Sequence, residues 1–512
     1  MELNLVTLVP EGATPQAGDE EINSHLWRVT GPNDPATKDL KFHCVSYVWG
    51  RGVEKRGSFF NCQREISDQT RPVLEAAIKA AEVIHRDLGG EKVEAFWIDA
   101  LCIPQLEGSP RLKTLESMGF IYNAGMSVII ALKSSVWDIV QQASATVSPE
   151  PLSLPDMQIL EADQWISRVW TYQELVNSRA TYFTTPASPS NSSIHVVVEA
   201  TQFFNCVGHS LSRYKRDNHV SESAAIATFP NLHVLEDTLL DSTMSGYLQR
   251  PALGILSNIS MRSFDSKFPQ NRLLACIGAL TIEASWGSPS SSLDQLAEKI
   301  MGLCEAKGDF SFIFTADRRS EESGKTWRPT TASSERGDEP THLIPIINWY
   351  VHSEPFGETQ RGRKDESGFW LEGMVPLQLA ESMNVDSVAE LDKFLWGHTV
   401  QLNPTILSSK GIFGKEDKKE DGNAALVGFL KQMGFRGCCE PHLCETGLFF
   451  SQENLGSVKA VELFAATSVR YYYGAPGLAR WNEAALGGES RYCSGVFVGL
   501  AKRELARPLL MI

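Results

Sequence analysis

The chain has 512 residues, of which 42% are hydrophobic and 21% are charged, with 39 glycines and 25 prolines. This length and composition exclude a small single module and a wholly disordered or fibrous chain, and they predict two or three compact domains. Acidic residues outnumber basic residues by 62 to 47, which gives a net charge of −15. Because such a surface repels phosphate backbones, we expect no general binding of nucleic acid.

The sequence contains no apolar run of about 18 residues, the length that a membrane helix needs. Its N-terminal segment, MELNLVTLVPEG, is too short and too acidic for a secretory signal. We therefore expect a soluble, cytoplasmic protein without membrane partners, whose cysteines are reduced. Cys438, Cys439, His442 and Cys444 cluster, but ligands this close in sequence strain tetrahedral zinc geometry, so no metal site is predicted.

The first region of the chain alternates between strand-like and helix-like patterns. The apolar periodicity predicts, in chain order, a strand over residues 42–50, a helix over 71–90, a strand over 95–105, a helix over 112–125, a strand over 126–132 and a helix over 163–179. Such alternation predicts an α/β fold with a mostly parallel sheet that is covered by helices on both faces.

Composition divides the rest of the chain into two further regions. The α/β domain is expected to occupy residues 1–185, and a mainly helical accessory region follows at 186–317, with a helix start predicted at Ser-Ser-Leu-Asp, residues 291–294. Strand-like runs such as YCSGVFVGLAKREL predict a mixed α/β region over residues 341–512, to which the sequence assigns no role. The polar stretch 318–340 is expected to be a long flexible joint.

In open parallel sheets, ligands bind outside the carboxyl ends of the strands, so the residues at those ends form the candidate site. They are Ser46, Tyr47, Trp49, Gly50 and Arg51 after the first strand, Asp99 and Gln105 after the second, and Lys133, Ser134 and Ser135 after the third. An indole can stack on a flat ring, a glycine allows a phosphate to approach the backbone, and an arginine supplies positive charge.

Three stretches, in this order, resemble the fungal heterokaryon incompatibility (HET) domain. They are VSYVWG at 45–50, WIDALCIPQ at 97–105 and RVWTYQEL at 168–175. Two further segments, MGFIYNA at 118–124 and FPQNRLLACIGAL at 268–280, look like parts of the same family pattern. The order and spacing of the blocks together make the resemblance specific.

The chain also departs from that family pattern at three positions. Pro104, Glu116 and Asn271 stand where the family usually has Asn, Gln and Asp. Proline at position 104 removes a side-chain amide and a backbone donor from the edge of the candidate site.

The resemblance implies an effector of nonself recognition that triggers programmed cell death in fungi. HET domains also look similar to TIR domains, so it implies a TIR-like (flavodoxin-like) sheet and self-association through this domain. The stretch ISRVWTYQEL resembles the TIR helix whose glutamate acts in NAD cleavage, and this carries the catalytic role over to Glu174. NAD is then a substrate and no bound cofactor is implied, while Arg168 and Trp170 on the same helix are ligand-binding candidates.

Other interpretations of the same residues remain open. Glu174 could form an ion pair with Arg168 or Arg51 at a helix surface, and Trp97 and Trp170 could belong to the core. Asp99 could cap the turn that follows its strand. The whole domain could be a non-catalytic, TIR-like assembly module that signals through partners, or a HET-fold protein with an unrelated regulatory role.

Overall fold

The computed structural model describes most of the chain in detail. The described residues are 3–31, 40–50, 52–54, 58–62, 65–104, 108–145, 150–186, 195–220, 222–243, 250–285, 292–330, 342–347, 359–366, 368–380, 427–428, 430–431, 434–438, 441–456, 458, 460–469, 471, 474–482, 489–499 and 501–511. Arg51 and Gln105 lie outside this set, so the structure does not place these two candidate residues.

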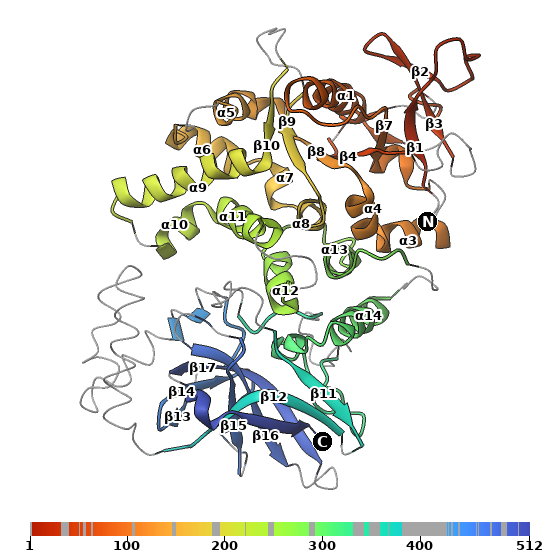
Figure 1. Ribbon diagram of the computed structural model, residues 1–512. Coiled ribbons are helices and arrows are strands. Elements are labelled where there is room, and N and C mark those ends of the chain that lie inside the picture. The colour runs from red at the N-terminus through yellow and green to blue at the C-terminus, as the bar shows by residue number, and fades with distance from the viewer. Residues whose placement is uncertain are drawn as a thin grey trace.

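The N-terminal part is built on a mixed eight-stranded sheet with the order β10-β9-β8-β4-β7-β1-β3-β2 (Figure 1). Its strands are β1 (Leu5–Leu8), β2 (Glu20–Ile22), β3 (His25–Thr30), β4 (His43–Tyr47), β7 (Ala95–Ile98), β8 (Ser127–Ala131), β9 (Thr181–Thr184) and β10 (Val197–Glu199). The central strands β9, β8, β4 and β7 pair in parallel, as predicted. The outer strands pair antiparallel, because residues 5–30 and 197–199 extend the sheet at both edges.

The parallel strands have the spatial order β7-β4-β8-β9, which is 2-1-3-4 in chain order. This order matches the first four strands of a flavodoxin-like sheet. The chain leaves β4 toward one edge and then returns past it to β8, so the topological switch point lies between β4 and β8. Ligand sites in open α/β sheets form at such a point, outside the carboxyl ends of the strands.

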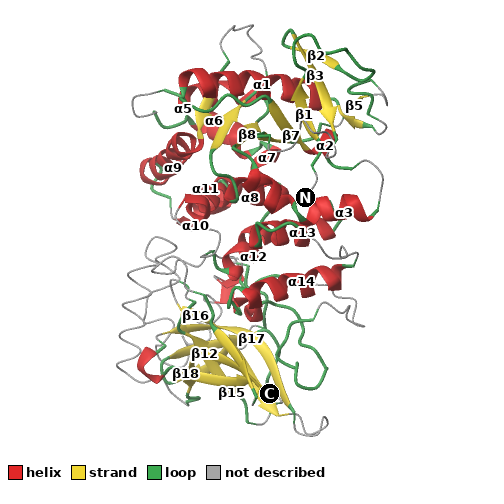
Figure 2. Cartoon of the chain, turned by 45° about the vertical axis from the view of Figure 1, so that its right-hand side comes forward, coloured by secondary structure: helices red, strands yellow, loops and turns green. Residues whose placement is uncertain are grey.

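Helices cover both faces of this sheet, as predicted (Figure 2). On one face lies α1 (Thr70–Asp87), and Thr70 hydrogen-bonds with the hydroxyl of Tyr47 at 2.9 Å. On the other face lie α4 (Met118–Ala124) and α8 (Val169–Val176), and the Cys44 thiol donates to the carbonyl of Ile121 at 3.6 Å. Side chains of adjacent strand residues point to opposite faces, so Cys44 and Ser46 share the face of α4 and α8.

Several shorter elements complete the N-terminal part. They are β5 (Val53–Glu54), β6 (Ile66–Ser67), α2 (Asp99–Cys102), α3 (Ser109–Glu116), the 3-10 helix η2 (Ser134–Val136), α5 (Trp137–Ala143), α6 (Leu154–Glu161) and α7 (Gln164–Ser167).

The helix predicted over residues 163–179 is interrupted, so that prediction is wrong in one respect. Arg168 separates α7 from α8 and is extended, with φ −72° and ψ 143°. Around it, the Val169 amide donates to the carbonyl of Ser263 at 3.0 Å, and the Ser263 amide donates to the carbonyl of Ser167 at 2.7 Å. This pairing with a distant segment takes backbone groups that a continuous helix would use. The helix predicted over 112–125 is likewise divided, into α3 and α4 at Ser117.

The middle region is mainly helical, as predicted. Its helices are α9 (Ala200–Asp217), α10 (Glu222–Thr228), α11 (Pro230–Thr243), α12 (Ala252–Ser260), α13 (Gln270–Leu280) and α14 (Leu293–Ala306), followed by the 3-10 helix η3 (Ser311–Phe314). The predicted start of α14 is confirmed, because Ser292 and Gln295 form a reciprocal capping box. None of the described helices is long and apolar enough to cross a membrane.

The C-terminal region forms a second, antiparallel sheet. Its strand order is β11-β12-β15-β16-β17-β14-β13, with β18 also paired to β12. The strands are β11 (Gly362–Asp365), β12 (Gly368–Leu377), β13 (Pro441–Cys444), β14 (Gly447–Ser451), β15 (Glu462–Ala466), β16 (Gly474–Asn482), β17 (Ser490–Gly499) and β18 (Arg507–Met511), and the 3-10 helix η6 (Arg503–Leu505) precedes the last of them. Figure 1 shows α12, α13 and α14 between the two sheets.

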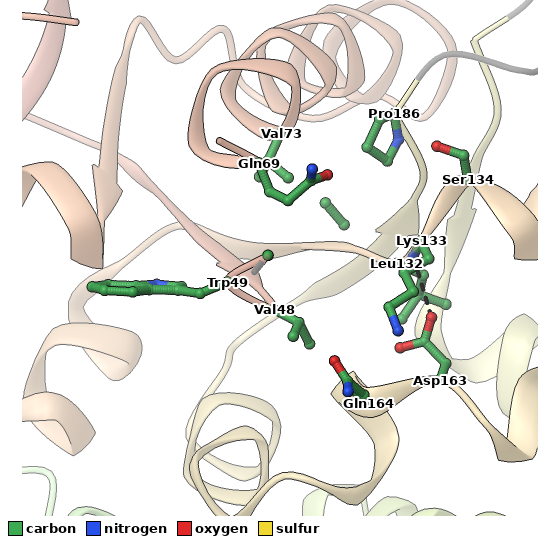
Figure 3. Close-up of a pocket in the computed structure, with 12 residues that line it drawn as sticks. Val48, Trp49, Gln69, Val73, Leu132, Lys133, Ser134, Asp163, Gln164 and Pro186 are labelled. Atoms are coloured by element: carbon green, nitrogen blue, oxygen red, sulfur yellow. Dashed lines mark hydrogen bonds between the residues drawn. The ribbon is translucent and has the colours of Figure 1, made fainter. Parts of the chain in front are cut away.

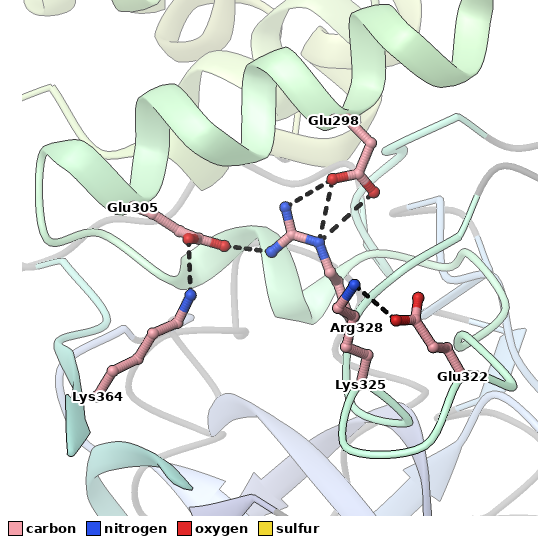
Figure 4. Close-up of polar contacts among 6 residues, drawn as sticks. All are labelled: Glu298, Glu305, Glu322, Lys325, Arg328 and Lys364. Carbon is pink, nitrogen blue, oxygen red and sulfur yellow. Dashed lines mark hydrogen bonds and ion pairs between the residues drawn. The ribbon is translucent and has the colours of Figure 1, made fainter. Parts of the chain in front are cut away.

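The stretch predicted as a flexible joint is packed over its described part, residues 318–330. Trp327 is buried, and its ring lies 4.3 Å from the ring of Phe369 between centroids. Arg328 forms ion pairs with Glu298 and Glu305 of α14 (Figure 4). Trp327 therefore holds this stretch against β12, and Arg328 holds it against α14.

One helix belongs to two hydrophobic cores. Leu175 of α8 packs in the core of the N-terminal sheet. Val169, Tyr172 and Val176 of the same helix pack in a second core, which is shared by α12, α13, α14 and the C-terminal sheet. The accessory regions are therefore continuous with the part of the chain that carries Glu174.

Candidate functional site

The carboxyl group of Glu174 lies against β4 in the protein interior. Its side chain is only 7% exposed, and Ser46 Oγ donates a hydrogen bond to Glu174 Oε2. Ser46 Oγ in turn accepts a hydrogen bond of 2.7 Å from Trp165 Nε1. The Tyr122 hydroxyl also hydrogen-bonds to the carboxylate. Three side chains from three separate elements thus fix the position of this carboxyl group.

Burial raises the pKa of Glu174 from its ordinary value to about 7. The hydrogen bond from Ser46 and the positive charge of Arg168 oppose this rise, and the negative charge of Asp99 adds to it. At neutral pH the group therefore populates both its neutral and its ionised form. A carboxyl group in this condition can stabilise a developing positive charge or transfer a proton.

Asp99 and Trp49 meet beside Glu174, at the carboxyl ends of β7 and β4. Trp49 Nε1 donates to Asp99 Oδ2 at 3.0 Å. Ile98 pairs with Val45 in the parallel register, which places Asp99 level with Ser46. Asp99 is the first residue of the short helix α2, and its Oδ1 also accepts the amide of the adjacent Ala100 at 2.6 Å.

The other described candidates lie around this group in different ways. Arg168 donates through Nη1 to the carbonyl of Tyr47 at 3.3 Å, which holds its charge near Glu174. The Tyr47 side chain turns to the opposite face of the sheet and contacts Thr70. Trp170 is half-buried and packs against both hydrophobic cores. The structure thus gathers Ser46, Trp49, Asp99, Arg168 and Glu174, and leaves Tyr47 and Trp170 in packing positions.

Burial distinguishes between the interpretations of Glu174, Trp97 and Cys102. Glu174 is buried, and within the described residues no ion pair joins it to Arg168. Trp97 is fully buried and packs edge-on against Tyr122 at 5.6 Å between ring centroids. The Cys102 thiol is also buried, which raises its pKa to about 12 and makes it a poor nucleophile.

A separate cavity of about 700 Å³ opens on the other side of β4, at the switch point between β4 and β8 (Figure 3). Its described lining comes from the ends of these strands and from α1, α7 and β9: Val48, Trp49, Gly50, Gln69, Val73, Ala131, Leu132, Lys133, Ser134, Asp163, Gln164 and Pro186. Figure 3 shows the indole of Trp49 turned away from the other labelled side chains, consistent with its bond to Asp99. Neither Glu174 nor Asp99 is part of this lining.

Gly50, in the loop that follows β4, packs closely against residues 67–69. Its amide donates to Ser67 Oγ at 2.7 Å. A Cβ at this position would lie 2.5 Å from Asp68 Oδ1 and 2.7 Å from Gln69 Cγ. The absence of a side chain therefore allows the segment of residues 67–69 to approach the loop, and the amide is already bonded.

Sequence reasoning missed two hydrogen-bonding residues of this group, Tyr122, which bonds Glu174, and Trp165, which bonds Ser46. Both lie in stretches that were predicted as helices, and both are almost fully buried. The available signal was the residue type, because a buried tyrosine or tryptophan usually needs a hydrogen-bond partner for its O–H or N–H group. The partner itself could not be predicted, because Ser46 lies 119 residues from Trp165 in sequence.

The described residues contain no group of three or more His, Cys, Asp or Glu side chains that could hold a metal ion. Of the clustered residues near position 440, Cys439 lies outside the described residues. The Cys438 thiol donates weakly to the carbonyl of Glu453 and contacts the Ser451 hydroxyl, and Cys444 is buried in β13.

Comparison with known proteins assigns the domain that carries this site. Residues 42–174 match the family model described as heterokaryon incompatibility protein (HET). No curated protein and no solved structure matches the chain. The matched segment begins just before β4 and ends at Glu174, so it contains every residue that the structure gathers around that carboxyl group. Residues 42–174 of this chain are therefore a HET domain, and this domain relates the protein to heterokaryon incompatibility.

Proposed function

We propose that this protein acts in heterokaryon incompatibility by cleaving NAD, with Glu174 as the catalytic residue, and that the loss of NAD triggers cell death. The observation that carries this proposal is the buried carboxyl group of Glu174, whose pKa of about 7 reflects a dry site beside Asp99 and Trp49. Perturbed carboxyl groups at the carboxyl edge of an α/β sheet are typical of catalytic sites.

The proposed reaction breaks the bond between the nicotinamide nitrogen and C1′ of the ribose. Water adds to C1′, nicotinamide leaves with the bonding electron pair, and ADP-ribose and one proton are the other products. The ribose carbon becomes positively charged as the bond breaks, and an ionised Glu174 in a water-poor site stabilises that charge. Asp99 adds a second negative charge nearby, and the indole of Trp49 offers a face for the nicotinamide ring.

A second candidate function is a non-catalytic assembly module that self-associates and recruits partners. One observation favours it. Glu174 already accepts hydrogen bonds from Ser46 and Tyr122, and it does not line the described cavity. A carboxyl group whose hydrogen bonds are all made within its own protein can stabilise the fold of a binding surface.

The two functions are separated by comparing the full-length protein with Glu174→Gln, which keeps the shape of the side chain and removes its charge. We expect nicotinamide release to fall by about 10²–10³-fold, the usual effect of losing one transition-state contact. The exposed Glu82→Gln variant on α1 is the matched control and should keep the wild-type rate. If Glu174→Gln kills fungal cells as fast as the wild type while NAD levels hold, the assembly function replaces the enzymatic one.

A further inference from the structure

The cavity between β4 and β8 takes no part in the reaction proposed for Glu174. We propose that it is a binding site for a phosphorylated ribose, so that a dinucleotide lies across the end of β4 with its reacting bond beside Glu174 and a phosphate beside Lys133. This inference rests on the proposed function for the identity of the whole substrate, but the cavity's preference for a phosphorylated ribose can be tested without it.

The cavity lies next to the end of β4, close to the group around Asp99. Trp49, at the end of β4, borders both sides: its indole bonds Asp99 on the β7 side, and the same residue lines the cavity on the β8 side. Val48 lines the cavity two residues after Ser46, the residue that holds Glu174. The Trp49–Asp99 pair and the cavity therefore flank the end of the same strand, β4, whose spacing from each neighbouring strand is about 5 Å. A dinucleotide is long enough to reach across the end of one strand.

The polar side chains that line the cavity suit a phosphorylated sugar. Lys133 is exposed and supplies a positive charge, the group that a phosphate needs, in a protein whose net charge is −15. Gln69 and Gln164, also exposed, offer amides that can donate to or accept from sugar hydroxyls. Val48, Val73 and Leu132 supply the apolar part of the wall. A volume of about 700 Å³ lies in the range usual for small-molecule sites.

Asp163 links the wall of the cavity to the helix that carries Trp165. This residue is 3% exposed, and its carboxylate accepts the Lys133 amide at 3.2 Å and the Trp165 amide at 2.8 Å. It therefore ties the loop after β8 to the start of α7, the helix whose Trp165 bonds Ser46. The loop that carries Lys133 and the group that positions Glu174 are thus fixed by the same carboxylate, which couples the two halves of the proposed substrate site.

The test compares steady-state cleavage of NAD with that of nicotinamide riboside, which has the same reacting bond and no phosphate. In the full-length protein, Lys133→Gln should raise KM for NAD about tenfold and leave kcat unchanged, because the lost contact is remote from the reacting bond. Ser134→Asp, which places a negative charge beside Lys133, should act in the same direction. Neither variant should alter the kinetics with nicotinamide riboside.

Lys92→Gln is the matched control, because Lys92 is exposed and precedes β7 at the opposite end of the sheet. Equal KM values for NAD in Lys133→Gln and Lys92→Gln, or an equal loss with both substrates, would overturn the inference.

Absence of NAD cleavage can be distinguished from absence of ligand binding in the cavity. If the wild-type protein does not cleave NAD, calorimetric titration with ADP-ribose still tests the cavity. Binding to the wild type that weakens about tenfold in Lys133→Gln supports the site without the reaction, since tenfold is the weakening expected for loss of one charged contact. Absence of ADP-ribose binding to the wild type rejects the site.

Discussion

The buried carboxyl group of Glu174 links pH to the stability of the fold. Burial raises its pKa to about 7 from an ordinary value of 4.5, so the folded protein binds this proton more tightly than the unfolded chain does. Between these two values, stability falls as pH rises, because the folded state must give up a proton or keep a buried charge. Glu174→Gln removes this dependence, so the variant should gain stability relative to the wild type as pH rises from 5 to 7.

The gain should approach about 3 kcal/mol above pH 7, measured by urea unfolding at each pH. Glu82→Gln, on the exposed side of α1, should leave the pH dependence of the wild type unchanged. Parallel curves for Glu174→Gln and the wild type over this pH range would show that the carboxyl group is solvated.

At the residue scale, the sequence indicated that side chains from separate blocks would lie close together, but it did not indicate which bonds join them. The order of Ser46, Asp99 and Glu174 in separate blocks was visible in the sequence, and the parallel sheet explains why they meet. The bond from Trp49 to Asp99 and the bond from Ser46 to Glu174 were not predictable, because each depends on strand register and helix position. A helix-surface ion pair with Arg168 and a phosphate contact at Gly50 were reasonable from the sequence, but burial and local packing direct these residues elsewhere.

At the element scale, α8 is held at both ends by arginines from the accessory region. Arg262 donates through Nη1 to the carbonyl of Ile166 at 2.9 Å and to Thr171 Oγ1 at 2.9 Å, at the start of the helix. At the C-terminal end of α8, Arg250 donates through Nη2 to the carbonyl of Val176 at 2.9 Å. The helix dipole favours a positive charge at this end. The helix that carries Glu174 is therefore positioned by residues outside the HET domain.

The crossing of α4 and α13 shows the same dependence. Gly119 of α4 packs so closely on α13 that a Cβ would lie 2.1 Å from the carbonyl oxygen of Gly278 and 2.4 Å from that of Thr281. These are backbone atoms that cannot turn aside, so Gly119→Ala must separate the helices. We expect a loss of about 2–3 kcal/mol in the free energy of unfolding, typical of overpacking. Gly302→Ala on α14 is the matched control.

No heavy atom lies within 4 Å of the added Cβ at Gly302, so this change should stabilise the protein by about 0.5–1 kcal/mol through helix propensity. Denaturant unfolding of both variants gives the comparison. Equal stabilities for the two alanine variants would mean that α4 and α13 are not in close contact.

Gly119 and Gly278, the two glycines where α4 and α13 cross, belong to segments that resemble the HET pattern. Their contact could not be predicted, because each segment alone looks like an ordinary amphipathic helix.

At the scale of the whole molecule, the three regions predicted from composition share their packing. The alternation of elements predicted the α/β domain, and the later strand-like runs predicted the second sheet, now seen as β15 and β17. The edges of the first sheet were missed, because the short strands β2 and β10 carry little apolar periodicity. The contacts between regions combine a shared apolar core with buried polar pairs, and the sequence offers no positional signal for those pairs.

The pair of Glu116 and Lys299 is one such contact, and it joins the HET domain to α14. The Glu116 side chain is fully buried, while Lys299 keeps 29% exposure. Glu116 Oε2 also accepts a hydrogen bond of 2.7 Å from Ser285 Oγ. Through Glu305, the same helix is ion-paired to Lys364 of β11, so α14 connects the HET domain to the C-terminal sheet (Figure 4).

Replacing one residue of this ion pair should show how much the pair contributes to the free energy of unfolding. Lys299→Met leaves the Glu116 carboxylate buried without its cation, and we expect a loss of about 3 kcal/mol in the free energy of unfolding. Adding Glu116→Gln, which restores the residue usual in HET domains, removes the unpaired charge and keeps an acceptor for Ser285, so the double variant should recover most of that loss. A double-mutant cycle in urea measures the coupling. Additive effects of the two changes would show that α14 stabilises the HET domain through its apolar contacts alone.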